Sequence, residues 1–266
     1  MLSKLLQRIV FLLTVILFFT ACSKNDPSVN ATRLRIKLTD APVLSVSEFN
    51  VDIQKIEIAI VDGTTDKDNW QSLKFDGGVY NILPLSNGKS KQIVDQYFPV
   101  GVTQRIKITF GDKSTLKISS RDIKNLILDP SIKDGVVLDV TANLYANYIT
   151  SIMIDINAAL SFYESNGNYF FKPVLRVFPE TFGGSLKGYA LPEEANPVVS
   201  IIKDEDTLYT IPERADGMFQ FKGLQEGVWK IRVLSAASLG YRDTLFTDTV
   251  SIGKTRELKS KIVLKK

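Results

Sequence analysis

Apolar and polar residues alternate with a period of two in one segment after another of this chain, beginning at residue 33. Residues 33–38 read Arg-Leu-Arg-Ile-Lys-Leu, and residues 105–110 read Arg-Ile-Lys-Ile-Thr-Phe. Because successive side chains of a strand point to opposite faces of a sheet, this alternation predicts strands with one buried face. The sequence therefore predicts an all-β chain, in which two antiparallel β-sandwich domains follow an N-terminal leader.

The alternating pattern stops at a Pro- and Gly-containing stretch around residues 179–184. We therefore expect a first domain over residues 33–180 and a second over residues 184–266. In the second domain, Trp229 alternates with cationic neighbours and should face the core. Seven short strands are predicted there, over residues 185–190, 198–203, 208–211, 218–221, 228–235, 245–250 and 258–264.

Two features of the first domain refine this prediction. The apolar set moves from odd to even positions at Gln54-Lys55, which one extra residue in a strand would produce, so a β-bulge is expected there. Two separate strands are the competing explanation. Residues 169–177 are expected to form a single strand whose Pro173 favours an edge or a bulge. The only helix candidates are short, around residues 89–96 and 120–126.

The first 22 residues have the pattern of an export signal. Two cations, Lys4 and Arg8, precede an apolar run over residues 9–19 that is too short to span a membrane comfortably. Thr20-Ala21-Cys22 then resembles a lipobox, so residues 1–21 are expected to be a lipoprotein signal peptide and residues 22–32 the anchor and tether. The resemblance implies a diacylglycerol on the Cys22 sulfur and cleavage before it. The alternative is a structural cysteine after an ordinary signal or short anchor.

The expected location follows from that leader. The export signal places the protein in the cell envelope, as an outer-membrane lipoprotein held by two or three acyl chains. Ser23 to Asp26 resembles the short polar signal that directs some lipoproteins to the cell surface. The sequence gives no sign of an oligomer, and we expect a monomer.

The absence of histidine excludes many activities. Without histidine, and with Cys22 as the only cysteine, the chain has no Ser-His-Asp system, no intramolecular disulfide and no Cys- or His-ligated zinc. The net charge is +4, and removal of Lys4 and Arg8 would leave +2, too little to indicate a nucleic-acid partner. No catalytic residue, metal or cofactor is therefore predicted, and we expect the protein not to be an enzyme.

Two sets of acidic residues are weighed against that expectation. Asp40 and Asp155 could in principle act as the carboxylate pair of a glycoside hydrolase, although Asp40 also suits a turn before Pro42. The loop from Asp62 to Asn69 contains hard oxygen ligands that could hold calcium, but its spacing is not that of an EF-hand. A solvated hairpin loop is the simpler interpretation.

Five motifs follow one another along the first domain, at residues 38–42, 51–58, 98–101, 154–161 and 171–177. Through them the domain resembles the domain of unknown function 4382 family. Asn157 stands where the family often has an acid. The resemblance implies an architecture and a secreted or envelope location, but no reaction.

In the second domain, an Asp216-Gly217 turn leads into an aromatic strand with Phe219 and Phe221, a Gly-Leu corner follows, and Gly227 turns the chain into the strand of Trp229. This pattern resembles that of the carboxypeptidase-regulatory-like, transthyretin-like sandwich, a relative of the immunoglobulin-type sandwich. Members of that family serve mostly as structural or accessory modules, and some relatives of the broad fold bind starch-like sugars.

Aromatic residues that border loops are the candidate ligand contacts, because aromatic faces stack on sugars and dominate protein hot spots. Core packing is the competing interpretation for each of them. The prediction is a non-catalytic, envelope-anchored binding or structural module that contacts an envelope protein or a glycan. The alternative is a carbohydrate-binding accessory lipoprotein of a polysaccharide uptake system. The candidate contacts are Trp70, Tyr80, Tyr97, Tyr145 and Tyr148.

Overall fold

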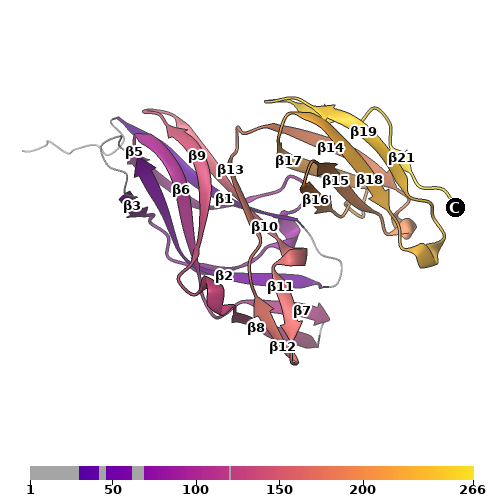
Figure 1. The fold of residues 1–266 in the computed structure, drawn as a ribbon, viewed down its shortest axis with the longest axis horizontal. Helices are drawn as coiled ribbons and strands as arrows, with labels where there is room; N and C mark the ends of the chain where they lie inside the picture. The colour runs from indigo at the N-terminus through magenta and orange to yellow at the C-terminus, as the bar shows by residue number, and fades with distance from the viewer. Residues whose placement is uncertain (1–29, 42–45, 62–68, 120) are drawn as a thin grey trace, which may run out of the picture.

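The computed structural model describes residues 30–41, 46–61, 69–119 and 121–266 (Figure 1). The leader, Cys22 and the 62–68 part of the acidic loop lie outside the described residues, so the expectations for them stay predictions. Within the described ranges, no helix is long and apolar enough to cross a membrane.

The fold is all-β, as predicted, and the first domain contains two sheets. In the four-stranded sheet, in the order β13-β10-β1-β5, β1 and β10 run parallel and the other pairs antiparallel. Its strands are β1 (Ala31–Ala41), β5 (Lys91–Pro99), β10 (Ile149–Asn157) and β13 (Leu175–Pro179).

The nine-stranded sheet has the order β11-β12-β8-β7-β2-β6-β9, with β3 and β4 also paired to the long strand β2. Only β12 and β8 run parallel in it. Its strands are β2 (Glu48–Val61), β3 (Asn69–Ser72), β4 (Gly78–Asn81), β6 (Gly101–Phe110), β7 (Thr115–Ser119), β8 (Asp122–Leu128), β9 (Val136–Leu144), β11 (Phe162–Ser165) and β12 (Asn168–Phe171).

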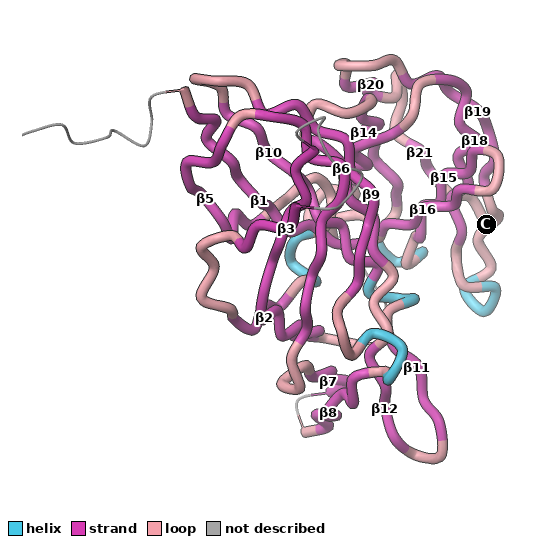
Figure 2. Tube along the Cα trace, turned by 60° about the vertical axis from the view of Figure 1, so that its left-hand side comes forward, coloured by secondary structure: helices cyan, strands magenta, loops and turns pink. Residues whose placement is uncertain are grey.

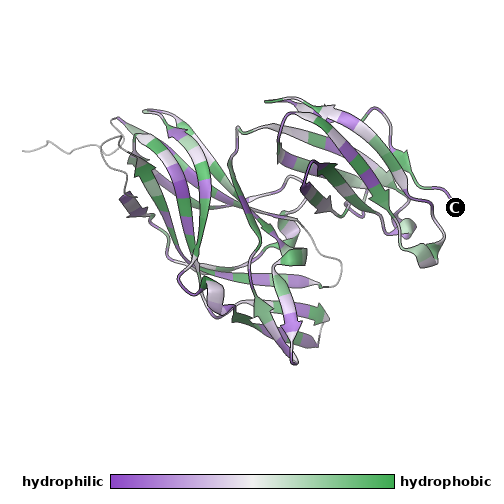
Figure 3. Ribbon diagram, viewed as in Figure 1, coloured by the Kyte–Doolittle hydropathy of each residue, from purple (hydrophilic) through white to green (hydrophobic). Residues whose placement is uncertain are grey.

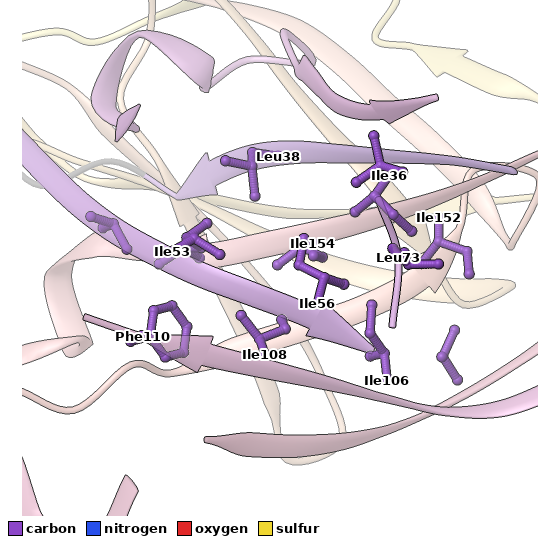
Figure 4. Packing of buried hydrophobic residues seen from close by; sticks show 14 of the residues in the cluster. Ile36, Leu38, Ile53, Ile56, Leu73, Ile106, Ile108, Phe110, Ile152 and Ile154 are labelled. Atoms are coloured by element: carbon purple, nitrogen blue, oxygen red, sulfur yellow. The ribbon is translucent and has the colours of Figure 1, made fainter. Parts of the chain in front are cut away.

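The core of the first domain lies between these two sheets (Figure 4). Ile36 and Leu38 of β1 meet Ile56 of β2, and all three side chains are fully buried. The register of β2 against β6 shifts between Ile53 and Lys55, which confirms the predicted bulge. The extra residue lets β2 keep its apolar side chains on the core face before and after that point.

The second domain also has two sheets, in the orders β17-β14-β20 and β16-β15-β18-β19, and β21 pairs with β14 beyond β20. Figure 3 shows apolar and polar residues alternating along its strands. Trp229 faces the core and is 2% exposed, while Lys230 and Arg232 are exposed. The strands are β14 (Gly184–Leu191), β15 (Val198–Lys203), β16 (Asp206–Thr210), β17 (Met218–Leu224), β18 (Gly227–Leu234), β19 (Thr244–Val250), β20 (Thr255–Glu257) and β21 (Ile262–Val263).

Short 3-10 turns are the only helical elements of the described chain (Figure 2). The two helix candidates are wrong: residues 89–96 lie largely in β5 and residues 120–126 largely in β8. Pairing with β1 and with β7 and β12 satisfies their backbone groups, which outweighs weak local propensity. The 3-10 turns are η1 (Leu83–Leu85), η2 (Pro130–Ile132), η3 (Ala158–Leu160), η4 (Glu193–Ala195) and η5 (Ala237–Leu239).

Two predicted strands differ in the structure. Residues 169–177 form β12 in the large sheet and β13 in the small one, and the chain changes sheets at Pro173, which cannot donate to either ladder. Of residues 258–264, only Ile262–Val263 form a strand, β21; the residues before it connect it to β20, and Leu258 packs over Gly188. The absence of a Cβ at Gly188 leaves room for both Leu258 and the Phe219 ring.

Candidate functional site

Two acidic residues lie on adjacent strands where the two domains meet. The parallel register of β1 and β10 places Thr39 opposite Asp155 and Asp40 opposite Ile156, so the two acids are offset by one residue, and Asp40 shares the core face with Ile156. Asp40 is 6% exposed, and neither of its carboxyl oxygens accepts a hydrogen bond of good geometry from the described residues. Both acids were candidates from the sequence, and the fold places them on neighbouring strands.

Their environments differ. Burial, and secondly the negative charge of Asp155, raise the pKa of Asp40 well above its usual value, and the backbone N–H of Ala158 counteracts this only in part. Asp155 instead accepts hydrogen bonds from Arg176 Nη2 at 2.6 Å and from Arg176 Nε at 3.1 Å. One acid therefore favours its neutral form and the other is neutralised by an ion pair.

The space at this junction is small. A pocket of about 40 Å³ is lined by Asp40, Asp155 and Arg176 from the first domain and by Tyr209 and Lys222 from the second. That volume holds about one water molecule and is far too small for a sugar ring. The junction therefore has no room for the substrate that a carboxylate pair of a glycoside hydrolase would need.

Hydrogen bonds across the junction join the two domains. Arg176 on β13 also donates from Nη1 to the carbonyl oxygen of Gly223 at 3.0 Å and from Nη2 to that of Lys222 at 3.1 Å. Its guanidinium carbon lies 4.8 Å from the centre of the Phe178 ring. A single side chain thus links the small sheet of the first domain to β17 of the second.

A loop after η1 with a buried Asn87 completes this joint, and it was not among the sites predicted from the sequence. Asn87 is 6% exposed; its Nδ2 donates to the Ile211 carbonyl at 2.8 Å, and its Oδ1 accepts from Thr210 Oγ1 at 2.8 Å. Lys222 Nζ donates to the carbonyl of Gly88 at 2.7 Å. The available signal was Asn87-Gly88 itself, a dipeptide suited to positive φ, which the structure confirms at 54° and 80°.

A second candidate site lies at the end of the first domain where β1 begins. The backbone N–H of Asn147 donates to the carbonyl of Ala31 at 2.9 Å, and that of Arg33 donates to the carbonyl of Tyr148 at 2.8 Å. These bonds hold the loop between β9 and β10 against the first residues of β1.

An open groove of about 640 Å³ runs between this loop and residues 179–181. Tyr145 and Tyr148 line it with 60% and 67% of their surfaces exposed, and their ring centres lie 6.2 Å apart in an edge-to-face arrangement. Ile149 lies beside them and is 56% exposed. Clustered exposed apolar side chains of this kind mark surfaces that contact another molecule.

The other predicted contacts are distributed differently. Tyr97 pairs with Arg33 at the same end of the domain and is exposed. Trp70 is half-buried on β3, outside the groove lining. Tyr80 packs against the core and stacks on Phe75 with ring centres 6.4 Å apart, and burial raises the pKa of its hydroxyl. The structure thus groups Tyr145 and Tyr148, with Tyr97 nearby, and separates Tyr80 from them.

Comparison with known proteins places the first domain in a family. Residues 31–173, just over half of the chain, match a family model described as "Domain of unknown function (DUF4382)". No curated protein matches the sequence.

Two solved structures are similar at a distance. One, described as the Bacillus anthracis TIE protein, is 13% identical with a TM-score of 0.26; the match covers 82% of this chain and 35% of that one. The other is a shaft pilin from Lactobacillus rhamnosus GG, 9% identical with a TM-score of 0.25, covering 88% of this chain and 97% of that one. TM-scores this low carry no conclusion about the function of this chain.

Proposed function

Because this chain belongs to the family described as a domain of unknown function (DUF4382), whose description names no reaction, we propose its function from its own residues. The protein is a non-catalytic binding or structural module, anchored in the outer membrane of the cell envelope by lipid on Cys22. The observation that carries this proposal is the groove of Tyr145 and Tyr148, which opens where the chain emerges from the proposed tether.

The junction chemistry supports a role without catalysis. Asp155 is held by Arg176, and the buried Asp40 favours its neutral form, so the two acids fit a structural joint better than a pair of reacting groups. The second domain, residues 184–266, is proposed to be a carboxypeptidase-regulatory-like accessory module. Its rigid attachment through Arg176 and Asn87 would fix its position relative to the membrane.

Cell fractionation tests the anchoring. In cells that produce the full chain, Cys22→Ser should move the protein from the membrane fraction to the soluble fraction, because the only acylation site is lost. Mass spectrometry of the purified native protein should find acyl chains on Cys22 and no leader. An unmodified thiol, or a Cys22→Ser chain that remains in the membrane, would refute the proposal.

A carbohydrate-binding accessory role is the second candidate, and the exposed tyrosine faces in the groove favour it, because aromatic faces stack on sugar rings. A glycan array probed with the chain starting at Ser23 tests it. Binding should fall at least tenfold in Tyr148→Ala, corresponding to about 1.4 kcal/mol. The matched control is Tyr209→Ala, which removes an exposed tyrosine of the second domain. Equal losses in both variants, or no binding by the parent chain, would remove this candidate.

A further inference from the structure

Exposed apolar side chains lie on both domains, on segments that adjoin the start of β1 or follow one another from it by backbone hydrogen bonds. Backbone hydrogen bonds link its parts: Asn147 to Ala31, Glu180 to Ser151, and Gly253 to Gly183. In Figures 1 and 2, the start of β1, the β9–β10 loop and the β19–β20 turn all lie along the upper side of the molecule. We call this the tether-side surface; it consists of Val100, Tyr145, Tyr148, Ile149, Phe182 and Ile252.

Each of these six side chains is between 46% and 67% exposed. Two cations near this surface are paired: Arg33 Nε with Asp95 at 2.6 Å and Lys37 Nζ with Glu180 at 2.6 Å. Lys254, two residues after Ile252, is exposed and could meet lipid phosphates. Tyrosine rings have an apolar body and a polar hydroxyl, which suits the layer between lipid headgroups and acyl chains.

The length of the tether places this surface close to the bilayer. Cys22 and Ala31 are nine residues apart, so even a fully extended tether spans at most about 30 Å. Short tethering raises the effective concentration of the surface at the membrane to the order of millimolar, so a weak contact suffices to hold it there.

We propose that the tether-side surface lies in the headgroup layer of the membrane, so that lipid, rather than a protein or a glycan, covers it. This inference rests on the proposed acylation of Cys22. Two domains joined rigidly by Arg176 and Asn87 would then lie along the bilayer, with Tyr148 and Ile252 both in contact with it. The end of the large sheet that contains β7 and β8 lies on the opposite side of the molecule from the tether-side surface in Figure 1, and it would stay in water.

Site-directed spin labelling tests this in the full lipidated chain. The native protein has no cysteine except Cys22, so in an acylated chain one new cysteine is the single labelling site. Three variants are compared: Tyr148→Cys, Ile252→Cys and Ile123→Cys, the last being a matched control that is 61% exposed on β8. Each is placed in vesicles of phosphatidylethanolamine with a minority of phosphatidylglycerol. Collisions of the label with oxygen and with a water-soluble nickel complex are then measured.

The expected result is a severalfold higher oxygen-to-nickel collision ratio for labels at positions 148 and 252 than for the label at position 123. If all three labels report water while the protein floats with the vesicles, the inference is overturned and the proposed anchoring stands. Two labels per chain would show that Cys22 carries a free thiol. That result, or a protein that does not float with the vesicles, would overturn both the inference and the proposed anchoring. If the label at position 148 becomes shielded from the nickel complex only after a glycan is added, the inference is overturned in favour of the carbohydrate role.

Discussion

Replacing Arg176 with methionine should weaken the whole molecule, because one guanidinium serves both domains. It pairs with Asp155, whose side chain is only 12% exposed, and donates to the carbonyl oxygens of Lys222 and Gly223. Methionine keeps much of the side-chain volume but removes every one of these donors. Asp155 would then stay largely buried with an uncompensated charge.

The magnitude follows from the degree of burial. Exposed ion pairs contribute about 0–1 kcal/mol, and removing one partner of a fully buried pair costs about 3–5 kcal/mol. The Arg176 side chain is 33% exposed and that of Asp155 12%, so the pair lies between these limits. We expect a loss of about 2–3 kcal/mol in the free energy of unfolding, or roughly 5–10 °C in Tm.

Thermal unfolding by calorimetry, with urea unfolding followed by tryptophan fluorescence, measures this loss. The matched control is Arg232→Met, which breaks an ion pair with Asp243 in which both side chains are more than 40% exposed, and it should cost less than about 1 kcal/mol. Adding Asp155→Asn to Arg176→Met should recover part of the loss, because the remaining group is no longer charged. Equal destabilisation by Arg176→Met and Arg232→Met would refute the reasoning.

Two further predictions concern the same joint. Since the folded-state pKa of Asp40 is raised, its contribution to stability is fully present below the unfolded value of about 3.8 and is lost as the pH rises through the folded value. Asp40→Asn should therefore gain in Tm relative to the parent as the pH rises above about 4; a pH-independent difference between the two would contradict this. Gly223 has a φ of 63°, and a Cβ there would overlap the Phe178 ring, so Gly223→Ala should cost about 2 kcal/mol or more. Gly240→Ala, at a φ of 71° with open space around it, should cost only the backbone strain of about 1 kcal/mol, and equal losses by urea unfolding would show that the ring contact does not matter.

Features set by local pattern were predictable. The bulge at Gln54-Lys55 and the buried position of Trp229 both follow from which neighbours are apolar, since a strand alternates its faces whatever it pairs with. The Asn-Gly dipeptide at residues 166–167 is typical of a hairpin turn, and its φ values of 51° and 76° are the positive values that such turns require. These features need only a few consecutive residues.

Pairing between distant segments was not predictable. Residues 89–96 form a strand because β1, more than 50 residues earlier, provides a ladder for them. The parallel pairing of β1 with β10 brings Asp40 beside Asp155 across more than 100 residues of sequence. No local pattern encodes which strand will be the neighbour, because many pairings bury similar apolar surface and the whole set of strands decides among them.

By itself, the sequence determined the all-β class, the phase of many strands and the list of aromatic residues that border loops. Only the tertiary structure decided which of those aromatics act together: it packed Tyr80 against Phe75 and left Tyr145 and Tyr148 exposed beside the start of β1. The physical reason is that the exposure of a side chain depends on which distant elements cover it, and the residues around one sequence position do not specify those elements.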